Sequence, residues 1–395
     1  MRTPICDQLG MEFPILAFSH CRDVVAAVSK AGGFGVLGAT THTPEQLEVE
    51  LRWIDEAVEG RPYGVDVLVP QKLSGMGEGD RGSGGIPRDA RGCGGVPRDS
   101  LTAALRDLIP DEHRQFVDRL LVEHGIEPSE STGEEPAWDV AIGLSAGGAL
   151  RLIEVALAHP VRLVANALGP PPPELLDMAH DRDVLVAALV GKREHAERQQ
   201  AAGVDIIVAQ GYEAGGHTGE IATMVLVPEI VDAVAPLPVL AAGGIASGRQ
   251  MAAAMALGAQ GVWTGSVWLA TKEAETHPVV MEKFLAAGSS DTVRSRSLTG
   301  KPARQLRSAW TDAWDGPGSP GPLPMPLQPL LVESARRRIS RAATAGSPGA
   351  QQLINYFVGQ VVGSLQTVKP ARQVVYEMVE DYVDTVTRLS GGLEA

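Results

Sequence analysis

The sequence predicts an α/β protein built on a (β/α)8 barrel, in which parallel strands alternate with helices. Short, nearly continuous apolar runs alternate along the chain with longer stretches that place apolar residues every three or four positions. The short runs are typical of strands buried on both faces, and the longer stretches are typical of helices. About eight such pairs follow one another, with no break in their order that would mark an open sheet. A closed barrel is therefore favoured.

Taken in order, the elements of the barrel have clear local signals. Strands are predicted at residues 14–17, 35–38, 63–69, 161–168, 183–189, 205–210, 238–242 and 261–269, and helices at 23–31, 44–58, 146–158, 173–180, 192–202, 227–234 and from 247 onward. The second helix has the clearest start, because Thr43 and Gln46 have the spacing of a capping box and Pro44 occupies the first turn.

A long insertion and a C-terminal extension interrupt this pattern, so the barrel is predicted from residues 1–70 and 137–285. The insertion, 71–136, contains two consecutive ten-residue repeats, RGSGGIPRDA (81–90) and RGCGGVPRDS (91–100). These repeats have too few apolar residues to fold alone, which predicts a flexible loop. Residues 101–126 are predicted to form a helical lid over the barrel mouth, and 286–395 a mainly helical region that packs on the barrel.

The composition excludes several classes of partner. Arg and Lys number 34 against 48 acidic residues, a net charge of −14 that would repel nucleic acid and anionic membranes. No apolar run is long enough to span a bilayer, and the N-terminus lacks a signal-peptide pattern, so a cytoplasmic protein is expected. Three scattered cysteines predict neither a disulfide framework nor a metal site. A homo-oligomer is compatible with the sequence.

Two glycine-containing loops after the seventh and eighth strands predict a phosphate site. AAGGI (241–245) follows the seventh strand, and WTGS (263–266) lies about 20 residues later. Barrel enzymes often bind phosphate between these two loops, through backbone N–H groups that glycine leaves accessible. Neutral amide donors suit a phosphate dianion in a chain of negative charge.

The loop after the sixth strand, QGYEAGGHTG (210–219), predicts a catalytic site. It lies at the carboxyl end of a barrel strand, where catalytic groups collect. His217 is flanked by glycines in this loop, and an imidazole can take or give a proton near neutral pH.

Together with AGGFGVLGA (31–39), these motifs resemble the nitronate monooxygenase family, and flavin-dependent enoyl reductases of fatty-acid synthesis share them. The resemblance covers about residues 10–70 and 140–285. It implies FMN as cofactor and the oxidation of alkyl nitronates or nitroalkanes with O2 to a carbonyl compound and nitrite. It also implies that His217 is the catalytic histidine. The residues expected to bind FMN are Asp66, Gln210, Gly215, Gly216, Gly243, Gly244, Trp263, Thr264, Gly265 and Ser266.

The sequence departs from the family pattern beside the expected flavin. The segment AFSHC (17–21) replaces the usual Ala-Pro-Met, so Phe18, Ser19 and His20 are expected to shape the substrate pocket. Asp66 stands where many members have Asn, and a carboxylate there would disfavour a reduced, anionic flavin unless it were protonated or paired.

Other functions remain open at this stage. The shared motifs would also serve an NAD(P)H-dependent enoyl thioester reductase, or a flavin-binding protein without turnover. The pentapeptide GLSAG (143–147) matches a hydrolase nucleophile elbow at Ser145, but such a match is frequent in a glycine-rich chain. His20 and Cys21 could form a reactive pair. The run Arg336–Arg338 is predicted to be a solvated helix face.

Overall fold

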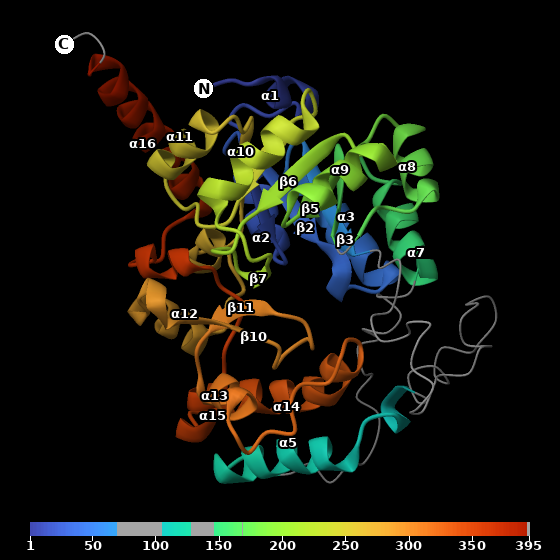
Figure 1. Cartoon of the computed structure of the whole chain (residues 1–395), viewed down its shortest axis with the longest axis vertical. Helices are drawn as coiled ribbons and strands as arrows, with labels where there is room; N and C mark the ends of the chain where they lie inside the picture. The colour runs from blue at the N-terminus through green and yellow to red at the C-terminus, as the bar shows by residue number, and fades with distance from the viewer. Residues whose placement is uncertain (69–104, 128–145, 168, 393–395) are drawn as a thin grey trace.

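The computed structural model describes residues 1–68, 105–127, 146–167 and 169–392, and eight parallel strands form a closed barrel at its centre (Figure 1). The strands follow one another around the barrel in the order β1-β2-β3-β4-β5-β6-β8-β9. Strand β1 pairs with β9 to close it, with Ile15 opposite Val262 and Ala17 opposite Thr264. The predicted (β/α)8 barrel is confirmed.

The elements of the barrel agree with the sequence prediction to within a few residues at each end. The strands are β1 (Ile15–Ser19), β2 (Phe34–Gly38), β3 (Tyr63–Leu68), β4 (Leu163–Ala167), β5 (Leu185–Val190), β6 (Ile206–Gln210), β8 (Val239–Ala242) and β9 (Gly261–Thr264). The helices are α2 (Arg22–Lys30), α3 (Pro44–Ala57), α7 (Ala146–Ala156), α8 (Pro173–His180), α9 (Arg193–Ala202), α10 (Thr223–Val234) and α11 (Gly248–Ala256). The last strand is shorter than predicted, because a 3-10 helix (Ser266–Ala270) begins just after it.

Local interactions explain where these elements start. The predicted capping box of α3 is present: the Gln46 N–H donates to Thr43 Oγ1 at 3.2 Å, and the Thr43 N–H donates to Gln46 Oε1 at 2.9 Å.

None of the helices in the described ranges is both long enough and apolar enough to span a bilayer.

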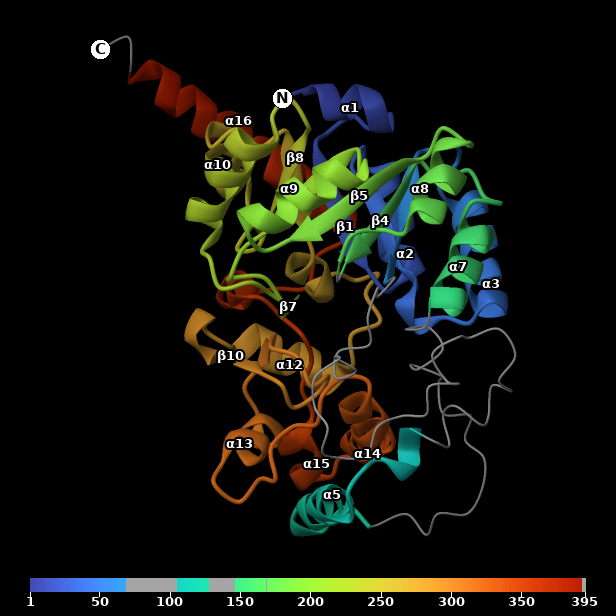
Figure 2. The same ribbon diagram turned by 45° about the vertical axis from the view of Figure 1, so that its right-hand side comes forward.

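Large apolar side chains fill the barrel and close one end of it. Leu16, Phe34 and Trp263 belong to the cluster inside the barrel, together with Ile5 and Leu9 of helix α1 (Pro4–Leu9). Helix α1 lies at the end of the barrel opposite the short strand β7 (Gly216–His217) in both views (Figures 1 and 2). The carboxyl ends of the strands are therefore the end left open for a site.

A smaller unit from the C-terminal part of the chain covers that open end. Its sheet has the order β10-β11-β7, in which β10 (Thr292–Ser295) and β11 (Ala303–Leu306) are C-terminal and β7 (Gly216–His217) belongs to the loop after β6. Its helices are α12 (Pro278–Ala286), α13 (Ala309–Asp315), α14 (Leu327–Thr344) and α15 (Pro348–Leu353). Figure 2 shows this unit on the same side of the barrel as β7.

The C-terminal extension is helical, as predicted, but it is interrupted over residues 354–370. Only the 3-10 turn Gln360–Ser364 is helical there, in a segment that contains Gly359 and Gly363 and ends at Pro370. The final helix, α16 (Ala371–Gly391), returns to the outside of the barrel and packs on α11 and α2. The α11–α16 contact is so close that a Cβ at Gly248 would overlap the backbone of α16.

Of the long insertion, the structure describes residues 105–127. Helix α5 (Asp111–Glu123) packs on α14, and the Phe116 and Trp314 rings meet edge to face with centroids 4.8 Å apart. It lies on the side of the C-terminal unit away from the barrel (Figure 1), so the smaller unit stands between the barrel mouth and the helix predicted as a lid. The ten-residue repeats lie outside the described residues.

Candidate functional site

A cavity of about 870 Å³ lies between the barrel mouth and the C-terminal unit, and it collects the site residues predicted from the sequence. Its lining includes His217, Asp66, Gln210, Gly215, Gly216, Gly243, Gly244, Trp263, Thr264, Gly265, Ser266, Phe18, Ser19 and His20. These residues come from β1, β3, β6, β8 and β9 or from the turns that follow them. Their convergence follows from the barrel, because the carboxyl ends of parallel strands meet at one rim.

The loop after β6 is held in place from both sides. Glu213 accepts hydrogen bonds from the Thr223 N–H at 3.0 Å and the Thr223 hydroxyl at 2.8 Å, which fixes the loop to the first residue of α10. From the C-terminal unit, Arg304 Nε donates to the Tyr212 carbonyl at 3.1 Å, and its guanidinium lies 4.4 Å from the centroid of the Tyr212 ring. A loop fixed in this way presents the following residues, up to His217, in a defined position.

His217 is placed by its own short strand. It pairs with Ala303 of β11, and its Nδ1 lies 3.4 Å from the Pro302 carbonyl oxygen. That bond requires the proton on Nδ1 and leaves Nε2 as an acceptor. Burial, aided by the nearby Lys301 cation, lowers the pKa of His217 to about 4, while the bond to Pro302 opposes the change. The imidazole is therefore neutral at physiological pH and available as a base.

The two glycine loops present open backbone donors to the cavity. Gly243 and Gly244 have φ of 98° and 72°, a left-handed conformation that favours glycine. Within the described ranges, the N–H groups of Gly243, Gly244 and Gly265 donate no hydrogen bond to the protein. A Cβ at Gly265 would meet nothing within 4 Å, so open space lies directly in front of this turn.

Asp66 is an ionisable group in an apolar position. Its side chain comes from β3, the residue is only 6% exposed, and in the described part of the chain its carboxyl group makes no hydrogen bond or ion pair. Burial raises the pKa of Asp66 to about 7. The carboxyl group is therefore substantially protonated near neutral pH, which meets the condition stated above for a carboxylate beside a flavin.

The residues of the unusual 17–21 segment line the cavity without forming a reactive pair. The Phe18 ring meets His20 edge to face at 5.1 Å and stacks on Trp263 at 6.4 Å. Burial lowers the pKa of His20 and raises that of Cys21. An imidazolium beside a thiolate would need the opposite changes, so the structure disfavours that chemistry.

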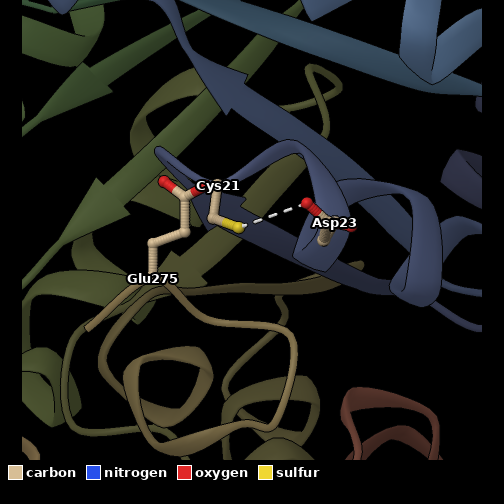
Figure 3. Close-up of side chains that lie close together, drawn as sticks. All are labelled: Cys21, Asp23 and Glu275. Carbon is tan, nitrogen blue, oxygen red and sulfur yellow. Dashed lines mark hydrogen bonds between the residues drawn. The ribbon is translucent and has the colours of Figure 1, made fainter. Parts of the chain in front are cut away.

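Cys21 also belongs to a group of potential metal ligands, shown in Figure 3 with Asp23 and Glu275. Their ligand atoms lie within 4.8 Å of one another. Metal binding requires a thiolate, whereas the Cys21 thiol donates to the Glu273 carbonyl at 3.0 Å and its pKa is raised by burial. This group is therefore a poor metal site.

The sequence analysis missed the part of the cavity wall that the C-terminal region supplies. The Gly359 N–H donates to Ser266 Oγ at 2.7 Å, and the Gln360 N–H donates to the Glu213 carbonyl at 2.9 Å. Arg336 of α14 lines the cavity, in contrast to the predicted solvated face. Glycines at 359 and 363 were the available signal, since they mark an irregular, closely packed segment. Ser145, of the alternative hydrolase motif, lies outside the described residues.

The chain is similar to known proteins both in sequence and in fold. The chain matches the nitronate monooxygenase family over residues 7–78 and 129–381. It is 61% identical over 393 residues, 99% of both chains, to a Mycobacterium tuberculosis protein provisionally named a monooxygenase. FabK from Thermotoga maritima aligns over 99% of each chain with 26% identity and a TM-score of 0.67. Nitroalkane oxidase from Streptomyces ansochromogenes shares the fold, with 24% identity and a TM-score of 0.74 over 98% of this chain and 99% of that chain.

Burial of the Asp66 carboxyl group predicts that the stability of the protein depends on pH. The pKa of Asp66 is higher in the folded protein than in the unfolded chain. The free energy of unfolding should therefore fall as pH rises from about 4 to 7, and this loss of stability is complete above pH 7. At about 1.4 kcal/mol per pKa unit, that cost is up to about 4 kcal/mol. Asp66→Asn should therefore be more stable than the parent protein at pH 8 and close to it at pH 4, as measured by urea unfolding. The exposed Asp107→Asn is the control, and an equal effect of Asp66→Asn at both pH values would contradict the prediction.

Proposed function

The chain belongs to the nitronate monooxygenase family and is an oxidoreductase, and from this premise we propose that it uses FMN to oxidise alkyl nitronates and nitroalkanes with dioxygen. The products would be a carbonyl compound and nitrite. The observation that carries the proposal is the cavity in which His217 and the open glycine donors come together. The small-molecule substrate and O2 would meet there.

The residues present fit the phosphate end of FMN. The unpaired N–H groups of Gly243, Gly244 and Gly265 would donate to phosphate oxygens, and the space in front of Gly265 would admit them. Ser266 would hold the same end of the cofactor, with its hydroxyl already oriented by the Gly359 N–H. A single phosphate site of this kind supports a mononucleotide.

The other residues of the predicted FMN site would contact the cofactor in different ways, because some of their side chains already make hydrogen bonds within the protein. Thr264 donates to the Leu16 carbonyl at 2.9 Å and lies 2.9 Å from Trp268 Nε1, so it would approach FMN through its backbone. Gln210, Gly215 and Gly216 would line the flavin ring and ribityl chain from the loop after β6. Trp263 would form part of the cofactor site from the strand that closes the barrel.

In the reaction, His217 would act on the substrate proton. When bound, flavin would serve as the electron acceptor for the nitronate, and dioxygen would then be the second reactant. A neutral nitroalkane must first lose its α-proton, and Nε2 of the neutral imidazole would accept it. With a preformed nitronate, the same side chain would only orient the anion. The burial that lowers the pKa of His217 would also reduce the contact of its side chain with water.

Anaerobic mixing tests the proposed function directly. The purified protein should be yellow, release FMN and not FAD on denaturation, and bleach when a nitronate is added without oxygen. Bleaching by NAD(P)H alone would instead support the enoyl thioester reductase, an alternative that the similarity to FabK keeps open. Bleaching by neither would support a flavin-binding protein without turnover. A colourless protein that cannot be reconstituted with FMN would contradict all three.

A substitution at Gly265 tests the phosphate site without backbone strain. Gly265 has φ of −126°, and an added side chain would enter open space. Gly265→Asp should weaken FMN binding by at least ~100-fold, because a carboxylate would face the phosphate at close range. Gly265→Ala is the matched control and should lose much less affinity. FMN fluorescence during titration of the stripped protein measures both, and equal affinities would place the phosphate elsewhere.

Replacing His217 should separate two forms of one substrate. His217→Asn keeps a donor of similar size but removes the base, so turnover of a neutral nitroalkane should fall roughly 10²- to 10⁴-fold. Turnover of the preformed nitronate should fall far less, since its proton is already lost. Steady-state rates with both forms at one pH measure the difference, with the exposed His180→Asn as control. Equal losses on both forms would show that His217 binds or steers the substrate and does not abstract a proton.

A further inference from the structure

One face of helix α14 forms a wall of the cavity. Pro329, Val332, Glu333, Arg336 and Ser340 line it, at the three- and four-residue spacing of a single helix face. In both views α14 lies farther from the barrel than β7, which carries His217 (Figures 1 and 2). This wall is therefore distinct from the strand ends that supply the predicted cofactor and catalytic residues.

The Arg336 guanidinium has no countercharge of its own on this wall. Glu333 is the nearest acid on the helix, but it forms an ion pair with Arg337 one turn on. Within the described ranges, Arg336 itself makes no ion pair or hydrogen bond. Glu333 is thus already engaged by another cation, which leaves Arg336 as a positive group on this wall in a chain whose net charge is −14.

The surroundings of Arg336 are those of a binding group rather than of a surface charge. Burial lowers the pKa of the Arg336 guanidinium, and the neighbouring Tyr356 and Glu333 oppose this change. Arg336 is half-buried, and a cation that is partly shielded from water and has no partner carries a free-energy cost that a fully solvated arginine would avoid. An anionic ligand entering the cavity would supply the missing partner.

Tyr356 adds a second donor. It lines the same cavity, and in the described part of the chain its hydroxyl group makes no hydrogen bond. Its ring packs on Phe357 with centroids 5.8 Å apart, which helps to fix its position. A guanidinium fork with a phenolic hydroxyl close by is a donor set suited to a planar or tetrahedral oxyanion.

We propose that Arg336 and Tyr356 form an oxyanion site, and that the substrate carries a carboxylate or phosphate group which binds there. The reacting carbon would lie toward His217, and the anionic group would lie against α14. This inference rests on the proposed function only in treating the ligand as the substrate. The site would select substrates by charge, because an uncharged analogue would leave the half-buried guanidinium unpaired.

Equilibrium binding tests the site independently of the chemistry. Isothermal titration calorimetry of the holoenzyme would use three probes of matched length: hexanoate, pentyl phosphate and hexan-1-ol. We expect one of the anions to bind at least ~10-fold more tightly than the alcohol, and the tighter anion identifies the group that the site takes. Arg336→Gln should reduce that affinity roughly 10- to 100-fold, and Tyr356→Phe by a smaller factor. Arg372→Gln, on the exposed surface of α16, removes the same charge outside the cavity and should have no effect.

Two results would overturn the proposal: an alcohol that binds as tightly as both anions, or an anion affinity unchanged in Arg336→Gln. If Arg336→Gln does not fold, as judged by its thermal transition, then Arg336→Lys and Tyr356→Phe decide, and unchanged affinity in both would also overturn it. Failure of the proposed function gives a different pattern, since anions would still bind through Arg336 while nitronates fail to bleach the flavin.

Discussion

The pairing of β7 with β11 is the interaction on which the site depends. It joins only Gly216 and His217 to Arg304 and Ala303, yet it connects the loop after β6 to the C-terminal unit. Arg304 strengthens the connection through the Tyr212 carbonyl and ring. Without this short sheet the barrel would still close, because its strands pair among themselves. His217, however, would lose its fixed position, since its pairing with Ala303 and the contact of its Nδ1 with the Pro302 carbonyl both belong to this sheet and the turn before it.

The cavity uses two different kinds of group to attract anions. At the strand ends the donors are neutral backbone N–H groups, and two titratable groups of the same cavity, His217 and Asp66, are shifted by burial toward their uncharged forms. At the α14 wall the donor is a full positive charge on Arg336. Neutral dipoles suit a cofactor that stays bound, since they add no charge to the site. A cation at the far wall suits an exchanging ligand, because it attracts anions through the field of a protein that otherwise repels them.

The sequence was enough to predict the barrel and one wall of the site. Strand and helix periodicity are local, and the rule that functional loops follow barrel strands then brings Gln210, Gly243 and Gly265 together without further information. The other wall could not be predicted, because its contacts join residues far apart in the chain, such as Ser266 and Gly359. Helical periodicity in α14 shows that it has an apolar face but not what that face covers. Arg336 therefore looked like a solvated residue until its neighbours were known.

Asp66 is buried and Arg336 is half-buried, and in the described part of the chain neither ionisable group has a charged partner of its own. Burial shifts the pKa of each group toward its uncharged form, so the charged form of each carries a free-energy cost that an apolar residue in its place would avoid. Residues that break the rules of core formation are retained where they act on something other than the fold. The two lie in one cavity but respond differently: Asp66 can avoid its cost by taking up a proton, whereas an arginine stays charged. A bound anion would relieve the cost of Arg336, which is why its environment indicates a ligand.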